Sequence, residues 1–386
     1  MRESFAQPAR RVRLDFRAHG ELEHADQPVR SDLSAVAAAG RCLWVANDEL
    51  ATVERLSRQD DGNYARHEIV HLAEIFDLPE GAEGEMEGLD VADGYLWVVG
   101  SHSLTREKPK PGEHDPAEAL ARLTEVEHHP NRHFLGRIPL IESAPGTFDL
   151  RPQAEGGERG TSRRSGCLKM TSRGDALDRQ LRGDVHIARF KGVPAKENGF
   201  DVEGIAARRS HVPGAARAGA ARLGPAARAS GQGNQARPPQ AQEGRSRRRA
   251  LRQALPRPRG PRHARARLRR RRAPDPRRAH QGPRRAGGPL PWPGALAATG
   301  QTVVPADQLE RVLNLPYGRG VDHAEGICWL PSDGAAPDHA AKELLVVYDS
   351  PVDDRLHDGT AIDADVFRLD GRGAARQPGK RPSGRS

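Results

Sequence analysis

The sequence predicts an all-β protein of the propeller class, and three observations support this prediction. A short motif, Glu-Gly followed by an apolar residue, recurs along the chain. Each copy opens a stretch of alternating apolar residues with a glycine-containing turn, which is the pattern of a β-hairpin. Most intervals between copies are about 52 to 65 residues, counting one copy that a one-base shift restores near residue 261, and units of that length with several short strands are typical of propeller blades.

The motif has three clear copies and one degenerate copy. The clear copies are GEMEGLDVADGYLWVVGSH (84–102), GFDVEGIA (199–206) and VDHAEGICWL (321–330). The degenerate copy, SDLSAVAAAGRCLWVANDE (31–49), keeps the turn and the LWVA strand but lacks Glu-Gly. The interval between the first two clear copies is about 116 residues, twice the usual spacing. We therefore expect a hidden unit near 140–150, at RIPLIESAPGTFDL.

Local signals inside the units agree with short strands. The segment LWVA (43–46) places Leu43 and Val45 on one face and Trp44 and Ala46 on the other, as in a strand,. Asp93-Gly94 and Ala39-Gly40 fit the turns of two hairpins. We therefore expect several hairpin-linked strands in each blade.

Two segments instead favour helix. Residues 115–127 have Asp115 at the N-cap and Pro116 at the first helical position, and residues 172–182 form a second, shorter candidate,. We expect both helices to be short excursions from blade loops.

An arginine-rich block from 208 to 291 interrupts the repeat. Residues 208–290 contain 24 Arg, no Lys and two acids, Glu243 and Asp275. Val212 is the last β-branched or aromatic residue before Trp292. Arg, Ala, Pro and Gly dominate, which is the composition that a GC-rich gene gives when it is read in the wrong frame. We predict that 213–291 is an out-of-frame translation that forms unpacked, disordered coil.

A one-base shift can turn this block back into repeat-like sequence. Permitted codons for RQALPRPRGPRHARA can be read as GKHFLDLEGLGMRE, which places a Glu-Gly-Leu near residue 261. The alternative is a genuine disordered, Arg-rich, RNA-binding insert. Such inserts have RGG or RS periodicity and interleaved aromatic residues that stack on bases, and the block has neither,. Genomic sequencing across codons 207–293 distinguishes the two.

The charge of the chain depends on this block. The whole chain carries +9 and residues 208–290 carry +22, so the remainder carries −13. The foldable part therefore does not favour a nucleic-acid partner. No apolar run approaches the roughly 18 residues of a membrane span, there is no secretory h-region, and the three cysteines form no CxxC pair,. We expect a cytoplasmic protein without a nucleic-acid or membrane partner, and a small-molecule or protein partner stays open.

The predicted organisation has five parts. They are an N-terminal segment (1–30), propeller blades (31–207), the arginine-rich block (208–291), further blades (292–370) and a disordered tail (371–386).

The motifs resemble those of the bacterial domain-of-unknown-function 3616 family. The residues that carry the resemblance are KENGFDVEGIA (196–206), GVDHAEGI (320–327), LLVVYDSP (344–351) and DVFRL (365–369). It covers residues from about 30 to 370. The resemblance implies a propeller-like β fold of about six blades, incomplete here, with no established activity. The Glu-Gly motifs are also similar to those of phytase-like and lactonase-like propellers.

The Glu-Gly motifs also define a candidate site. If each one begins the innermost strand of a blade, the carboxylates converge at one mouth of the central channel. The candidate metal ligands are Glu87, Asp201, Glu203, Asp322 and Glu325. Oxygen ligands favour Ca²⁺ over thiophilic metals. The candidate anion-binding residues are Lys196, Arg319, His323 and His102,. The alternative is structural, with the glutamates bonded to backbone N–H groups and the glycines allowing bulges or close strand approach.

Three functional hypotheses follow. The chain is an uncharacterised propeller with a non-catalytic binding or scaffold role, a calcium-assisted hydrolase of a phosphoester or lactone, or an inactive frameshifted product. It contains no GxSxG elbow, HExxH, Walker loop or Rossmann fingerprint,. The sequence does not decide whether the protein is an enzyme.

Overall fold

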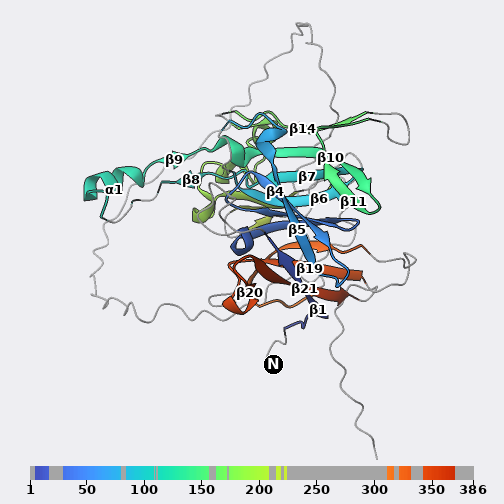
Figure 1. Ribbon diagram of the computed structural model, residues 1–386. Helices are drawn as coiled ribbons and strands as arrows, with labels where there is room; N and C mark the ends of the chain where they lie inside the picture. The colour runs from blue at the N-terminus through green and yellow to red at the C-terminus, as the bar shows by residue number, and fades with distance from the viewer. Residues whose placement is uncertain are drawn as a thin grey trace, which may run out of the picture. The chain divides into compact units, whose positions relative to one another are not determined.

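The structure is built from antiparallel β-blades whose strands mostly follow one another along the chain (Figure 1). It is a computed structural model. The residues that it describes are 5–16, 29–79, 84–107, 109, 112–155, 162–171, 174–207, 214–218, 221–223, 311–316, 321–331 and 342–369, with 214–218 and 221–223 described by backbone only. In these residues the predicted all-β, propeller-like fold is confirmed.

The first blade is a four-stranded meander. Its strands are β2 (Leu33–Ala39), β3 (Cys42–Asn47), β4 (Thr52–Arg58) and β5 (Tyr64–His71). Each strand pairs antiparallel with the next. Gly40 makes the predicted β2–β3 turn at φ +54°, a left-handed conformation that favours glycine.

The second blade has the same strand order but carries a long insertion. Its strands are β6 (Met86–Ala92), β7 (Tyr95–Gly100), β10 (Leu135–Ala144) and β11 (Thr147–Leu150). The insertion, residues 101–134, contains β8 (Thr105–Arg106), α1 (Pro116–Arg122), β9 (Val126–Glu127) and the 3-10 turn η4 (Pro130–His133). It separates the second strand of the blade from the third.

The hidden unit predicted near 140–150 is therefore wrong. β10 pairs with β7, and β11 pairs with β10. The segment RIPLIESAPGTFDL thus forms the outer strands of the second blade and does not open another blade. The doubled interval arises from the 101–134 insertion and from a second excursion, residues 151–199. Spacing alone cannot distinguish a degenerate repeat from an inserted loop.

The second excursion contains only short elements. They are β12 (Gln153–Ala154), β13 (Arg163–Arg164), β14 (Gly166–Cys167), α2 (Ala176–Leu181), η5 (Ala188–Phe190) and η6 (Ala195–Glu197). β14 adds to the second blade by pairing with β10. The excursion ends where the third blade begins.

Both predicted helices exist but are shorter than expected. In α1 the carboxylate of Asp115 accepts hydrogen bonds from the N–H groups of Ala117 and Glu118, as predicted for an N-cap,. None of the residues of α1 is buried, so no apolar face extends it to 127. α2 begins after a capping box between Asp175 and Asp178,. None of the described helices is long and apolar enough to cross a membrane.

The last blade joins the two ends of the described chain. Its strands, in order across the sheet, are β18 (His323–Trp329), β19 (Lys342–Asp349), β21 (Ala361–Leu369) and β1 (Arg10–Asp15), with β20 (Leu356–His357) also paired to β21. β1 pairs with β21 along its whole length (Figure 1). The predicted N-terminal segment 1–30 therefore contributes a blade strand.

The third blade begins with β15 (Phe200–Ile205), which pairs with β16 (Gly214–Ala218). β16 in turn pairs with β17 (Ala221–Leu223). The expectation of unpacked coil from 213 onward is wrong for these two strands. Ladder hydrogen bonds use only backbone groups, so the edge of β15 can pair with an Ala- and Arg-rich segment. The rest of the arginine-rich block, 224–291, lies outside the described residues, as does the predicted tail 371–386.

The first strands of neighbouring blades lie side by side in the order β18, β2, β6, β15. Their backbones approach closely at the motif glycines. A Cβ added to Gly88 would lie 2.8 Å from the Ile205 nitrogen and 2.9 Å from the Gly204 Cα. One added to Gly326 would lie 3.1 Å from the Ala35 backbone. The glycines therefore permit the close strand approach that the structural alternative predicted.

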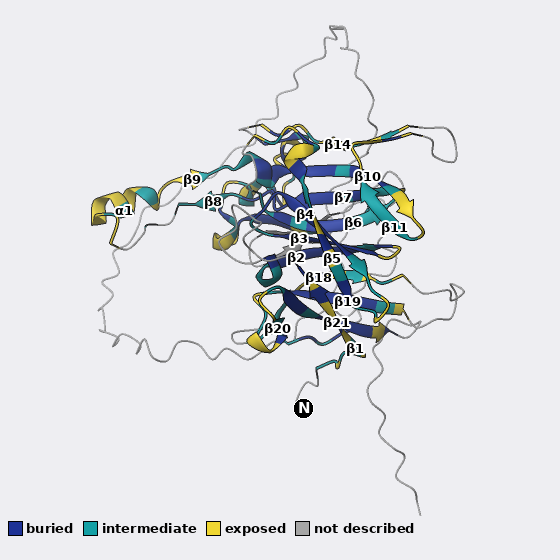
Figure 2. Cartoon of the chain, viewed as in Figure 1, coloured by how far each residue is buried: buried dark blue, intermediate teal, exposed yellow. Residues whose placement is uncertain are grey.

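Apolar layers fill the spaces between blades, and Figure 2 shows the strands as largely buried. Trp44 and Ala46 belong to the cluster shared with Met86 of the second blade. Leu43 and Val45 belong to the cluster shared with the last blade. β3 is therefore buried on both faces, and each fully buried large side chain contributes about 1.5–3 kcal/mol.

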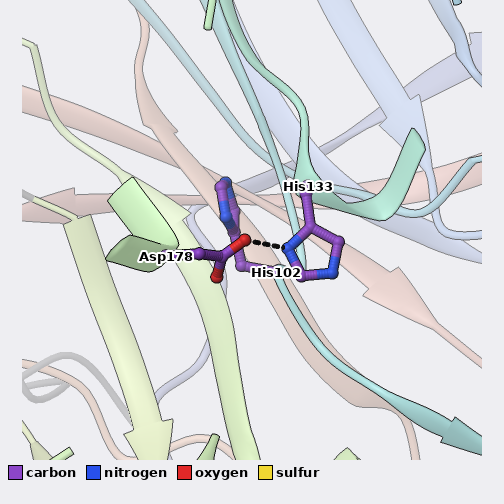
Figure 3. Close-up of side chains that lie close together, drawn as sticks. All are labelled: His102, His133 and Asp178. Carbon is purple, nitrogen blue, oxygen red and sulfur yellow. Dashed lines mark ion pairs between the residues drawn. The ribbon is translucent and has the colours of Figure 1, made fainter. Parts of the chain in front are cut away.

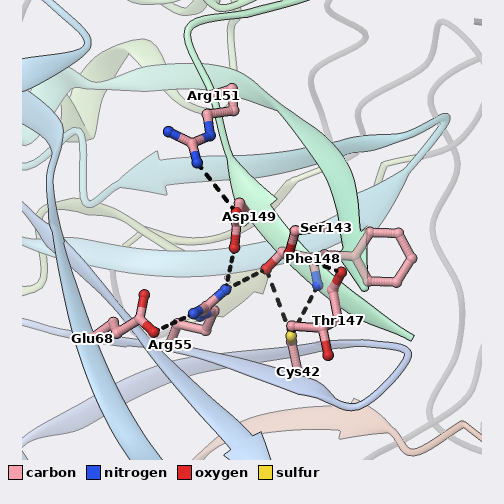
Figure 4. A network of polar contacts seen from close by, with 8 residues as sticks. All are labelled: Cys42, Arg55, Glu68, Ser143, Thr147, Phe148, Asp149 and Arg151. Carbon is pink, nitrogen blue, oxygen red and sulfur yellow. Dashed lines mark hydrogen bonds and ion pairs between the residues drawn. The ribbon is translucent and has the colours of Figure 1, made fainter. Parts of the chain in front are cut away.

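A polar network also links the first two blades (Figure 4). Arg55 of β4 is 8% exposed. Its guanidinium donates to the Phe148 carbonyl at 2.9 Å and pairs with Asp149 and Glu68. The Cys42 sulfur accepts from the Phe148 N–H at 3.2 Å. These contacts fix β11 of the second blade against β3 and β4.

Candidate functional site

The start of each first strand lies next to the end of the second strand, because the two strands are antiparallel. The Ser101 N–H, just after β7, donates to the carbonyl of Glu85, just before β6, at 3.1 Å. At the same end, a bridge between Asp349, the last residue of the second strand of the last blade, and Asp32, just before β2, joins the last blade to the first. We call this end of the blades the mouth and define it by its acidic residues Asp32, Asp48, Glu85, Glu87, Asp201, Glu325 and Asp349.

A β-bulge lies at the equivalent position of all four first strands. The register shifts between Leu33 and Ala35, Met86 and Gly88, Val202 and Gly204, and Ala324 and Ile327. The residues at the bulges are Ser34, Glu87, Glu203 and Glu325. A bulge redirects a side chain out of the normal alternation of a strand. The Glu-Gly motif is therefore a bulge that redirects a carboxylate.

Glu87 experiences the charges of acids from the first, third and last blades. Burial is the largest cause that raises its pKa well above the ordinary value, and the negative charges of Glu85, Asp201, Glu325 and Asp48 raise it further. Asp201 belongs to the third blade and Glu325 to the last. Carboxylates from several blades therefore lie within electrostatic reach of one another.

Two further acids of the mouth, in the first blade, have raised pKa values. Burial, followed by the charges of Asp32, Asp349 and Glu85, raises the pKa of Asp48 to about 7. Burial, Asp349 and Glu49 raise the pKa of Asp32 to about 6. One oxygen of each carboxylate is buried without a hydrogen-bond partner. The carboxylates of the mouth therefore repel one another when they are ionised.

The structure gathers three of the five predicted metal ligands, Glu87, Asp201 and Glu325. Glu203 is exposed and is not among the acids that most raise the pKa of Glu87. Asp322 instead accepts from the Val352 N–H at 2.9 Å and pairs with the Arg355 guanidinium at 2.8 Å. Its carboxylate thus helps to hold the last blade together.

The mouth does not form a preformed metal cage. Within the part of the chain that the structure describes, only His102, His133 and Asp178 bring three His, Cys, Asp or Glu ligand atoms within 4.8 Å of one another. A cation at the mouth would therefore have to draw its carboxylates together. The metal-binding role of the five predicted ligands stays a prediction.

The predicted anion-binding residues that the structure describes lie in different surroundings. Lys196 is exposed on η6, and Arg319 lies outside the described residues. His323 is opposite Asp349 in the β18–β19 register. His102 is 1% exposed. Anion binding by this set stays a prediction.

Four acids of the mouth were not predicted from the sequence, although most of them stand at recurring positions beside the strands. They are Asp32, Asp48, Glu85 and Asp349. Glu85 stands two residues before the bulged Glu87, as Asp201 stands before Glu203. Asp48 follows β3 in the segment VAND, and Asp349 is the last residue of β19 in the segment VVYD. Antiparallel pairing places both kinds of position at the same end of the blade. Glu85 differs from the others because it pairs with Arg132 and accepts a hydrogen bond from Ser103 at 3.3 Å.

Comparison with known families decides the relationship of the chain. The family model described as "Protein of unknown function (DUF3616)" matches residues 32–215 and 290–365, which is more than half of the chain. The chain belongs to this family. The DUF3616 match is interrupted close to the borders of the arginine-rich block, which is consistent with a discontinuity there.

The comparisons assign no activity to this fold. The description of the DUF3616 family names none. No curated protein and no solved structure matches the chain. A function must therefore be argued from the site itself.

Proposed function

We propose that the protein is a binding propeller whose acidic mouth takes a divalent cation. The observation that carries the proposal is the surroundings of Glu87, whose pKa is raised by burial and by carboxylates of its own and neighbouring blades. Ca²⁺ is the ion that suits this set, because it takes six to eight oxygen ligands in flexible geometry. Backbone carbonyls and waters can supply the remainder.

The charge pattern supports a cationic ligand over an anionic one. Like charges held close together repel, and a divalent cation replaces that repulsion by attraction. The bulges aim equivalent side chains from successive blades in the same way. A ligand on the channel axis would therefore contact several blades at once.

The test is a titration of the full chain with Ca²⁺ and Mn²⁺, followed by thermal unfolding. Ca²⁺ at about 100 times its Kd stabilises a protein by about 2.7 kcal/mol, which raises Tm by about 5–10 °C in a protein of this size. Glu87→Gln should abolish most of that rise. Glu118→Gln, on the exposed helix α1, is the matched control and should retain it. An equal rise in wild type and Glu87→Gln, or no rise in wild type, contradicts the proposal.

The proposal does not include catalysis. A hydrolase would also need groups that receive an anionic substrate, and the acidic residues that define the mouth do not supply them. We also propose that the protein is cytoplasmic and does not bind nucleic acid. All three cysteines are free thiols, which supports a reducing compartment, and the acidic mouth supports a cationic ligand over a polyanion.

A further inference from the structure

A second cluster of ligating side chains lies close to the mouth. It is near the place where Val99 of the second blade packs in one apolar cluster with Phe200 and Val202 of the third. It consists of His102, His133 and Asp178, whose side chains point toward one another (Figure 3). Their exposed fractions are 1%, 2% and 1%. One ligand atom from each residue lies within 4.8 Å of those of the other two. One ion could reach all three ligand atoms if they drew around it.

The cluster is built by the two excursions and not by the repeated strands. His102 follows β7 with a left-handed backbone at φ +50°, which is uncommon outside glycine. His133 ends η4, and Asp178 lies in the first turn of α2. The 101–134 insertion and the 151–199 excursion therefore meet at this point.

Fixed contacts orient the carboxylate of Asp178. Its Oδ2 lies 2.6 Å from His133 Nδ1 and accepts from the Asp175 N–H at 3.1 Å. Its Oδ1 lies 2.5 Å from Lys191 Nζ, which also donates to the His102 carbonyl at 3.1 Å. The buried ion pair with Lys191 favours the ionised carboxylate,.

The histidines carry buried ring nitrogens that form no hydrogen bond of normal geometry. These are both nitrogens of His102, whose ring also interacts with the Phe134 backbone, and the Nε2 of His133. His128, stacked on His133 at 4.1 Å between ring centroids, has the same property at both nitrogens. A buried polar atom without a partner costs about 1–3 kcal/mol. So many of them at one place indicate a ligand that accepts imidazole lone pairs.

We propose that His102, His133 and Asp178 bind a divalent first-row transition-metal ion of the zinc class. Two imidazoles and one carboxylate are a ligand set that Zn²⁺ takes, whereas Ca²⁺ prefers oxygen alone. The His102 side chain is 1% exposed, and such burial favours the neutral ring that a metal ligand must have. Lys191 and the Asp175 N–H hold the carboxylate from outside the ligand set, as supporting groups do at metal centres.

The contact between His133 and Asp178 has to widen to admit an ion. Two ligands of a tetrahedral Zn²⁺ with bonds of about 2.0–2.1 Å stand about 3.3 Å apart, compared with 2.6 Å between His133 Nδ1 and Asp178 Oδ2. Widening this contact lets the ion take the place of the proton between the two groups, and that proton leaves to solvent. Three protein ligands leave a fourth position for water or for His128.

The experiment uses the full chain after removal of metal by a chelator. Co²⁺ is added alone and followed by visible absorption, and Zn²⁺ is then added in competition. We expect Co²⁺ ligand-field bands that Zn²⁺ abolishes. His102→Ala and His133→Ala should each weaken Zn²⁺ binding by at least about 100-fold. His129→Ala, which removes a neighbouring histidine that pairs with Glu127 outside the cluster, should leave the affinity unchanged.

The outcomes separate this site from the calcium proposal, on which it does not depend. Glu87→Gln should keep Zn²⁺ binding, and His133→Ala should keep the Ca²⁺ response. Each variant is first checked for native circular dichroism, and His133→Gln replaces His133→Ala if the latter is unfolded. Absence of Co²⁺ bands in the wild-type protein overturns the proposal, and so does an unchanged affinity in both histidine variants.

Discussion

The mouth and the His102–His133–Asp178 cluster both hold ionisable groups away from solvent, but they are built in opposite ways. The mouth comes from repeated strands, so each blade supplies a similar acidic group and the pKa values of Glu87, Asp48 and Asp32 are raised. The cluster comes from two unique excursions, and the lowered pKa of Asp178 reflects contacts with His133 and Lys191. Repetition produces like charges that need an external partner, whereas the excursions supply complementary groups.

The largest expected effect is at Asp178. Asp178→Ala leaves Lys191 and His133 buried without their carboxylate, and breaking a buried ion pair in this way costs about 3–5 kcal/mol. Gln180→Ala, at an exposed position of the same helix, is the matched control and should change the free energy of unfolding by less than about 0.5 kcal/mol. Urea denaturation measures both. Equal stability of the two variants would show that the Asp178 contacts do not hold the excursions together.

The next effect distinguishes two glycines of the same motif. A Cβ at Gly88 would lie 2.8 Å from both the Ile205 nitrogen and the Val99 Cγ1, so Gly88→Ala should destabilise the protein by about 1–3 kcal/mol. A Cβ at Gly204 would meet nothing within 4 Å, so Gly204→Ala should be nearly neutral. Thermal unfolding of the two variants tests whether the approach of β6 to β15 is as close as described.

At Glu87 we expect the substitution to change the free energy of unfolding in the opposite direction. Replacing a carboxylate among like charges by a neutral isostere removes repulsion, so Glu87→Gln should stabilise the metal-free protein by about 1 kcal/mol at pH 8. Asp178→Ala and Glu87→Gln thus shift stability in opposite directions. Destabilisation by Glu87→Gln in the absence of cations would favour the structural interpretation, in which the glutamate accepts backbone hydrogen bonds.

The dependence on pH follows from the same groups. Folding raises the pKa of Asp48 to about 7 and of Asp32 to about 6, so the folded state retains protons that the unfolded chain has released. Their contribution to stability is complete below about pH 4 and declines as pH rises toward 7. Asp48→Asn should flatten the stability profile between pH 4 and 7. An unchanged profile would show that Asp48 ionises normally in the folded protein.

The smallest effect is expected at Glu203. Its side chain is exposed although it occupies the same bulge position as Glu87. Glu203→Gln should therefore change the free energy of unfolding by less than about 0.5 kcal/mol. Calcium titration of this variant then shows whether an exposed bulge carboxylate takes part in cation binding, separately from any effect on stability.

Much of the fold was readable from the repeat. Glu-Gly marks the first strand of three blades because each of these strands bulges there,. At Gly88 and Gly326 the strand also lies so close to its neighbours that a side chain would not fit. The alternation of Val12, Leu14 and Phe16, all buried, was an equally good strand signal. It was overlooked because no motif accompanies it, and its partner β21 lies at the other end of the chain.

The candidate sites were less readable. Residues of the mouth recur at fixed distances from Glu-Gly, so the sequence could indicate several of them. His133 and Asp178 have no such landmark, since they lie 45 residues apart in different excursions and meet only through tertiary packing. Spacing also misled the prediction near 140–150, because an inserted loop and a missing blade lengthen an interval equally.

The pairing of β1 with β21 sets the order of events in folding. β1 is synthesised first, but the residues that it pairs with are 361–366, so it waits for most of the chain to be translated. Bringing such distant segments together costs loop-closure entropy and slows folding. During that wait the edges of β1 and β21 are open to pairing with other chains. Removal of residues 5–16 would therefore leave the C-terminal blade with a permanently open edge, and self-association would begin at β21.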